Sequence, residues 1–218
     1  MTRIHGALAM AAATLGLAAA VADGRPAFDA SALASEISAE RDHITAPELA
    51  ARIMRQDPSL RVLDLRPRAD YDALHIPTAQ AVTFDELARA PLPRDASIVL
   101  YSEGGVHSAQ AWVLLRLRGY RDVRFLREGI YEWLARVMEP RLATDATPAE
   151  RAAFARAEEQ SRFFGGQPRS SVPRSDVPTG YWTDATLGQD SPAGGGGDAR
   201  GAAGAIRATI GNIRRRGC

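Results

Sequence analysis

The middle of the chain alternates short apolar stretches with longer amphipathic ones. Runs of β-branched and aromatic residues predict buried strands at 60–65, 81–84, 98–101 and 122–126. The clearest helix begins at the capping box Thr45-Ala-Pro-Glu48 and is expected to run from Pro47 to about Gln56. Strands that alternate with helices over this length predict an α/β fold, with a small parallel sheet and helices on both faces.

The segments that flank this region have weaker patterns. Residues 23–43 form a polar, alanine-rich lead-in. Residues 139–164 contain a second capping box, Thr147-Pro-Ala-Glu150, which predicts an appended helix through about Ser161. The fold is therefore expected to carry a further helix, packed on the edge of the domain.

The last part of the chain has the composition of a linker and a tail. Residues 165–199 are rich in glycine, proline, serine and aspartate, which predicts a disordered linker. Its aromatic pair, Tyr181 and Trp182, is interpreted as an incidental surface contact in preference to a docking motif. Residues 200–218 form a basic tail that could make weak contact with an acidic surface or a membrane, although most such runs are simply solvated.

The first 22 residues have the layout of an export signal. Arg3 gives a short basic start, 7–20 is an apolar run, and small residues precede Asp23 at the expected cleavage point. This layout predicts an exported protein, with the periplasm as its destination. The alternatives are an uncleaved anchor and a buried helix.

Charge and cysteine content restrict the partners. A formal net charge of +1 argues against nucleic acid as a partner. Cys218 is the only cysteine, so neither an intramolecular disulfide nor a cysteine-based metal site is expected, and no cofactor is indicated. A lone thiol at this position is inert, pairs with another chain, or acts as a reactive group on a tether.

The strand at 98–101 leads into a loop and a helix. Ser102 to His107 contains two glycines that allow a sharp turn, and Ser108 is the expected N-cap of a helix with an apolar face. Backbone N–H groups and the positive end of a helix would point into such a loop. The sequence therefore predicts an anion-binding loop.

This loop resembles the active-site loop of the rhodanese-like family, which has the pattern Cys-x-x-Gly-x-Arg before a serine. Gly105 and Ser108 fit that pattern, whereas Ser102 occupies the cysteine position and His107 the arginine position. The predicted anion-binding loop consists of Ser102, Glu103, Gly104, Gly105, Val106, His107 and Ser108. The resemblance implies a sulfurtransferase fold that has lost the nucleophilic cysteine.

A second signature of the family precedes the loop. It matches at Asp64, Arg66, Asp70, Tyr71, His75, Ile76, Pro77 and Ala79, and it departs at Leu74 and Thr78. The resemblance covers about 44–138. It implies a structural ion pair between Arg66 and Asp70, and His75 is interpreted as a hydrogen-bonded structural residue.

Three functional hypotheses follow from these residues. The preferred one is a non-catalytic, exported rhodanese-like module, a pseudoenzyme that binds a protein partner or a small oxyanion through its loop. It is preferred because a serine hydroxyl cannot hold a persulfide. The second is a sulfurtransferase that uses the tethered thiol of Cys218, and the third is a hydrolase that uses Ser102.

Overall fold

The computed structural model describes residues 30–89 and 91–182. The chain divides into two units, 1–31 and 32–218, and nearly all of the described residues belong to the second. The expected export signal at 1–22, the basic tail at 200–218 and Cys218 lie outside the described residues. None of the helices in the described part of the chain has the length and apolar character needed to span a bilayer.

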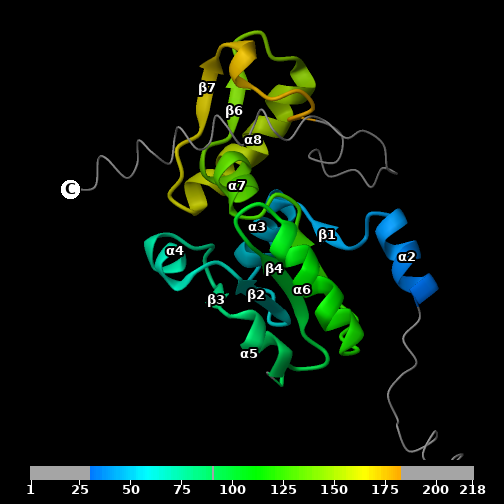
Figure 1. Ribbon diagram of the computed structural model, residues 1–218. Helices are drawn as coiled ribbons and strands as arrows, with labels where there is room; N and C mark the ends of the chain where they lie inside the picture. The colour runs from blue at the N-terminus through cyan, green and yellow to red at the C-terminus, as the bar shows by residue number, and fades with distance from the viewer. Residues whose placement is uncertain (1–29, 90, 183–218) are drawn as a thin grey trace, which may run out of the picture. The chain divides into compact units, whose positions relative to one another are not determined.

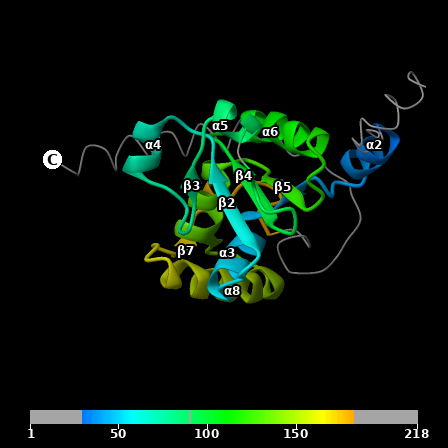
Figure 2. The same cartoon turned by 90° about the horizontal axis from the view of Figure 1, so that it is seen from below.

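Five parallel strands form the central sheet, in the order β1-β5-β4-β2-β3 (Figures 1 and 2). They are β1 (His43–Ile44), β2 (Leu60–Asp64), β3 (Gln80–Ala81), β4 (Ser97–Tyr101) and β5 (Val123–Leu126). All five residues of β4 are buried, and β2 lies beside it with Asp64 opposite Tyr101. The predicted parallel α/β sheet is thus confirmed.

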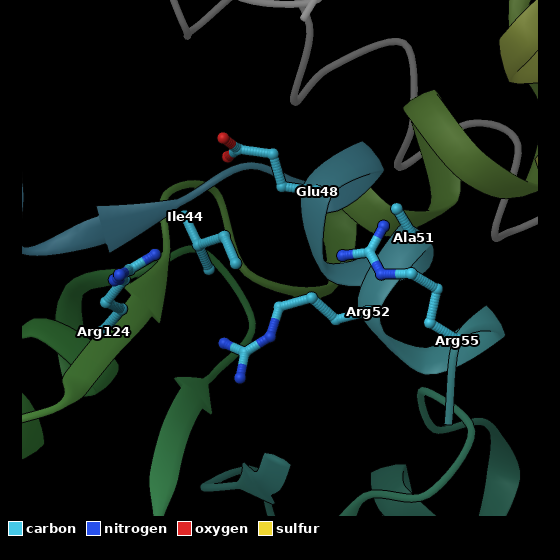
Figure 3. Close-up of a pocket in the computed structure, with 6 residues that line it drawn as sticks. All are labelled: Ile44, Glu48, Ala51, Arg52, Arg55 and Arg124. Carbon is cyan, nitrogen blue, oxygen red and sulfur yellow. The ribbon is translucent and has the colours of Figure 1, made fainter. Parts of the chain in front are cut away.

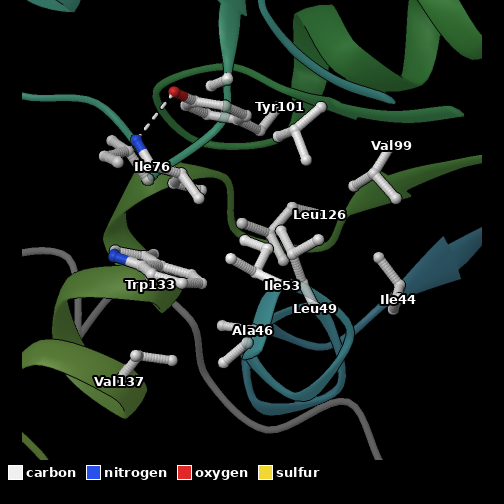
Figure 4. Close-up of a cluster of buried hydrophobic side chains, with 14 residues drawn as sticks. Ile44, Ala46, Leu49, Ile53, Ile76, Val99, Tyr101, Leu126, Trp133 and Val137 are labelled. Carbon is white, nitrogen blue, oxygen red and sulfur yellow. Dashed lines mark hydrogen bonds between the residues drawn. The ribbon is translucent and has the colours of Figure 1, made fainter. Parts of the chain in front are cut away.

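Helices cover both faces of this sheet. Because successive residues of a strand point to opposite faces, Val99 packs into one core cluster and Leu100 into the other. The helices are α3 (Ala46–Met54), α4 (Arg68–Ala73), α5 (Phe84–Arg89), α6 (Val106–Leu117) and α7 (Ile130–Trp133), which continues into the π-helical turn η1 (Leu134–Met138). The first cluster, shown in Figure 4, is closed mainly by α3 and α7, and the second by α5 and α6.

Both predicted capping boxes form. Thr45 N donates to Glu48 Oε2 at 2.9 Å, while Glu48 N donates to Thr45 Oγ1 at 3.4 Å, at the start of α3. Thr147 and Glu150 make the same exchange at the start of α8 (Pro148–Phe163). Each box satisfies backbone N–H groups that the first helical turn leaves without a partner.

The disordered linker predicted at 165–199 is wrong over 165–182, and 183–199 lie outside the described residues. Residues 169–172 form β7 (Arg169–Val172), which pairs in parallel with β6 (Arg141–Ala143), and the 3-10 turn η2 (Arg174–Asp176) follows. Tyr181 is only 5% exposed, and Trp182 Nε1 donates to the Arg141 carbonyl at 3.1 Å. The aromatic pair thus holds this segment against β6 and α8 and is not an incidental surface contact.

The lead-in is helical in part. α2 (Ala30–Ser38) is joined to α6 by an ion pair of 2.6 Å between Glu36 and Arg116. β1, which the apolar pattern did not predict, adds an edge strand beside β5. Because β1 has only two residues, its hydrophobic pattern is too short to be recognised from the sequence.

Candidate functional site

The candidate site is the loop between β4 and α6, at the carboxyl edge of the sheet. Parallel strands end at the same edge, so the segments after β2 and β5 reach this loop as well. Ile130 N, at the start of α7, donates to the Ser102 carbonyl at 2.9 Å. The segment between β5 and α7 therefore forms one wall of the site.

Ser102 lies at the centre of the loop and is 2% exposed. Its Oγ accepts hydrogen bonds from Gly105 N at 3.2 Å and Ser108 N at 3.4 Å, and it lies 3.3 Å from Ser108 Oγ. Ser108 Oγ donates its own proton to the Gly105 carbonyl at 2.8 Å. The proton of the Ser102 hydroxyl is therefore directed to Ser108 Oγ, and two loop N–H groups are directed to Ser102 Oγ.

Two glycines make this geometry possible. Gly105 has φ +91°, and a Cβ there would lie 2.2 Å from the Arg127 carbonyl oxygen. Gly129 has φ +59°, and a Cβ there would lie 2.1 Å from the Ser102 carbonyl oxygen. Both residues combine a left-handed backbone with a close approach of main chains, so a side chain fits at neither position.

Ser108 is not the N-cap of α6, as the sequence suggested. The helix starts at Val106 with Gly105 as its N-cap residue, so Val106, His107 and Ser108 already belong to its first turn. Ser108 is fully buried and holds the loop together from inside. The general preference of serine for caps gives way here because the left-handed Gly105 begins the helix earlier.

Glu103 and His107 lie on the exposed rim of the loop. The Tyr131 hydroxyl donates to Glu103 Oε1, and the His107 ring packs edge-on against Phe84 with their centroids 6.3 Å apart. Within 30–89 and 91–182, no histidine or carboxylate hydrogen bonds to Ser102. The loop therefore brings its polar residues together without forming a nucleophile–base pair.

A buried ion pair lies at the end of β2. Arg66 Nη2 donates to Asp64 Oδ2 at 2.7 Å, and the two side chains are 8% and 0% exposed. The same Nη2 donates to the Leu74 carbonyl at 2.6 Å, and the guanidinium lies 5.5 Å from the centre of the Tyr101 ring. The expected pairing of Arg66 with Asp70 is corrected by this geometry: Asp64, two residues away, meets the guanidinium with both oxygens.

His75 stacks on Tyr71, with ring centroids 4.1 Å apart, and its Nδ1 lies 2.9 Å from the Tyr71 carbonyl oxygen. These contacts support the structural role expected of it. In the described part of the chain, no group of three or more histidine, cysteine, aspartate or glutamate side chains is arranged to hold a metal ion.

Glu132 was missed by sequence reasoning. Its Oε1 accepts a hydrogen bond of 3.1 Å from Ala46 N at the start of α3, while its Oε2 is buried without a hydrogen-bond partner. Burial raises the pKa of this carboxyl to about 7. A glutamate between Tyr131 and Trp133 looks like an ordinary surface position of a helix, so the sequence carried no signal for it.

The comparisons with known proteins agree with this geometry. The family model for the rhodanese-like domain matches residues 45–136. Over 85 residues the chain is 34% identical to the probable adenylyltransferase/sulfurtransferase MoeZ of Mycobacterium tuberculosis. The matched stretch covers 37% of this chain and 21% of that protein. Over 130 residues the chain is 30% identical to the tRNA uridine(34) hydroxylase of Cronobacter sakazakii. The matched stretch covers 55% of this chain and 34% of that protein.

A solved rhodanese-like domain, from the Alr3790 protein of Anabaena sp., is 30% identical and has a TM-score of 0.39, with 42% of this chain and 72% of that chain covered. The chain spans only about a fifth to a third of the length of the two curated relatives. Residues 45–136 of the chain are a rhodanese-like domain.

Proposed function

We propose that this chain is a rhodanese-like binding module that does not itself transfer sulfur. The observation that carries the proposal is the hydroxyl of Ser102 at the position that holds the family's nucleophilic thiol. Sulfur transfer requires a thiolate that accepts a sulfur atom as a persulfide and passes it on. A serine hydroxyl stays protonated at any physiological pH and forms no such adduct.

The surroundings of Ser102 keep the electrostatics of a nucleophile position. Two backbone N–H groups point at its Oγ from the first turn of α6 and its N-cap. Donors of this kind stabilise a negative charge, and they would lower the pKa of a thiol placed there. The scaffold is thus preserved around an atom that cannot perform the reaction.

A serine hydrolase receives no support from this arrangement. A serine nucleophile needs a base within about 3 Å of its hydroxyl. The Ser102 hydroxyl is buried and directed to Ser108, while His107 contacts Phe84 on the surface. The geometry therefore does not favour Ser102 as a nucleophile.

Binding through the loop face is what the site still allows. Val106 is 69% exposed beside the exposed Glu103 and His107, which gives a partner both apolar and polar contacts. A small oxyanion would find few donors, because Gly105 N and Ser108 N already bond to Ser102. The binding function is therefore proposed for a protein partner first and for a weakly held oxyanion second.

Sulfur transfer through Cys218 is the second candidate, because one relative bears the name of a sulfurtransferase. The assay is thiosulfate:cyanide sulfur transfer by the full chain and by Cys218→Ala. The proposal predicts that neither protein forms thiocyanate. Turnover that disappears in Cys218→Ala supports the second candidate, and turnover that persists in it contradicts both.

Export is proposed from the signal-like residues 1–22. The mature chain should begin at Asp23, as measured by mass spectrometry of the periplasmic fraction. Recovery of the full-length chain from the cytoplasm would contradict this part of the proposal.

A further inference from the structure

A second polar site lies away from the loop, on the face of the sheet that α3 covers. It is an open hollow of about 300 Å³ between α3 and the edge formed by β1 and β5 (Figure 3). Three arginines, one glutamate and two apolar residues line it: Arg52, Arg55, Arg124, Glu48, Ile44 and Ala51.

The fold explains why the three arginines meet. Arg52 and Arg55 are three residues apart at the C-terminal end of α3 and so lie on one side of it. The residues on either side of Arg124 in β5 pack toward α6, so Arg124 points to the α3 face. In Figure 3, Arg124 approaches the hollow from β5, opposite the two arginines of α3.

The hollow and the loop have no residue in common. The hollow extends along α3, from Glu48 in its first turn to Arg55 at its C-cap, beside Ile44 of β1 and Arg124 of β5. The loop lies between β4 and α6. The two are therefore separate sites.

The charges around the hollow are only partly balanced. Arg52 donates from Nε and Nη2 to Asp57 Oδ2, at 3.0 and 2.8 Å. The Ser59 hydroxyl and then Arg52 lower the pKa of Asp57 to about 2, so this pair stays ionised at physiological pH. Glu48 is held in the capping box of Thr45.

Arg55 and Arg124 make no ion pair with any residue in 30–89 or 91–182. Two guanidinium groups without an ion-pair partner in the described part of the chain thus line the same hollow as a third that is held in place by Asp57. Like charges gathered at one surface repel each other, and an anion bound between them relieves that repulsion.

We propose that this hollow binds a small phosphate-bearing anion. The planar guanidinium of arginine presents paired N–H donors that match the oxygens of a phosphate group. A volume of about 300 Å³ accommodates a diphosphate or a small phosphate ester. This site is independent of the proposed function of the loop.

The test is isothermal titration calorimetry of the full chain with pyrophosphate at low ionic strength. One pyrophosphate should bind per chain, and Arg55→Ala and Arg124→Ala should each weaken binding about tenfold or more, as expected for the loss of a charge-assisted hydrogen bond. Arg151→Ala is the matched control, because Arg151 is an exposed arginine of α8 that does not line the hollow. His107→Ala is the control for anion binding at the loop.

A charge-conserving change separates a shaped site from general attraction. Arg124→Lys keeps the positive charge but loses the paired N–H donors of the guanidinium, so it should still weaken binding severalfold. Circular dichroism should show that all variants are folded, since the substituted side chains are exposed. Equal affinity in all variants, a loss as large in Arg151→Ala or His107→Ala, or no binding by the wild-type chain would each overturn the proposal.

Discussion

The hydroxyl oxygens of Ser102 and Ser108 lie 3.3 Å apart inside the loop between β4 and α6. The Ser108 hydroxyl donates a hydrogen bond to the Gly105 carbonyl, so the Ser102 hydroxyl donates within the pair and accepts from two backbone N–H groups. The hydrogen-bonding capacity of Ser102 is thereby used up inside the protein. The loop is a folded structural unit, and its stability is the first property that can be tested.

Gly105→Ala should destabilise the domain. Its backbone is left-handed, and the new Cβ would lie 2.2 Å from the Arg127 carbonyl oxygen. Strain of this kind costs about 1–3 kcal/mol, and the contact with the backbone adds to it. Gly104→Ala is the matched control, because the nearest atom to its Cβ would be Tyr131 Cε2 at 4.0 Å. Chemical denaturation measures both; equal stability of the two variants would show that the loop geometry is wrong.

Arg66→Ala should lower stability much more than a typical surface change. It leaves the fully buried carboxylate of Asp64 without its partner, which costs about 3–5 kcal/mol for a buried pair. Arg68→Ala breaks an ion pair with Asp72 whose side chains are 75% and 55% exposed, and it should cost at most about 1 kcal/mol. Thermal melts of the two variants make the comparison. If Arg66→Ala melts like Arg68→Ala, the pair is not the buried contact described above.

Glu132 should make the domain less stable as the pH rises. Its pKa is about 7 in the folded protein, against an ordinary value of 4.5, so the folded state binds more protons between these values. The stability is fully present below pH 4.5 and is lost as the pH rises through 7, by about 3 kcal/mol in total. Glu132→Gln cannot ionise and should remove this dependence. Urea unfolding of both proteins from pH 4.5 to 8 tests it, and parallel curves would contradict the buried state of the carboxyl.

Most of the sheet and the starts of α3 and α8 could be predicted because their signals are local. The burial of a strand such as β4 is visible in its consecutive apolar residues. Thr45 and Thr147 are each followed three residues later by a glutamate, and this capping-box pattern predicts the start of a helix. The loop was recognised for a different reason, its resemblance to a family pattern around Gly105 and Ser108.

What could not be predicted depends on contacts between distant residues. β7 consists mainly of exposed polar residues and becomes a strand only by pairing with β6, some 28 positions earlier. The burial of Tyr181 depends on its packing with Ala143 of β6 and with Val177. Arg66 forms its ion pair with Asp64 and not with Asp70 because of the side-chain geometry at the end of β2. The spacing of charged residues in the sequence does not reveal that geometry.

The proposed function rests on the thiol that Ser102 lacks, and restoring this thiol gives the most direct test. The full chain, Ser102→Cys and the double variant Ser102→Cys with His107→Arg are each incubated with thiosulfate, and the loop peptide is examined by mass spectrometry for one added sulfur atom. The wild-type loop should gain none. Ser102→Cys should gain a persulfide slowly, and the double variant faster, because a fixed positive charge at the rim attracts the anion and favours the thiolate. Sulfur transfer by the wild-type loop, or a folded double variant that forms no persulfide, would contradict the proposal that this is a sulfurtransferase scaffold lacking only its chemistry.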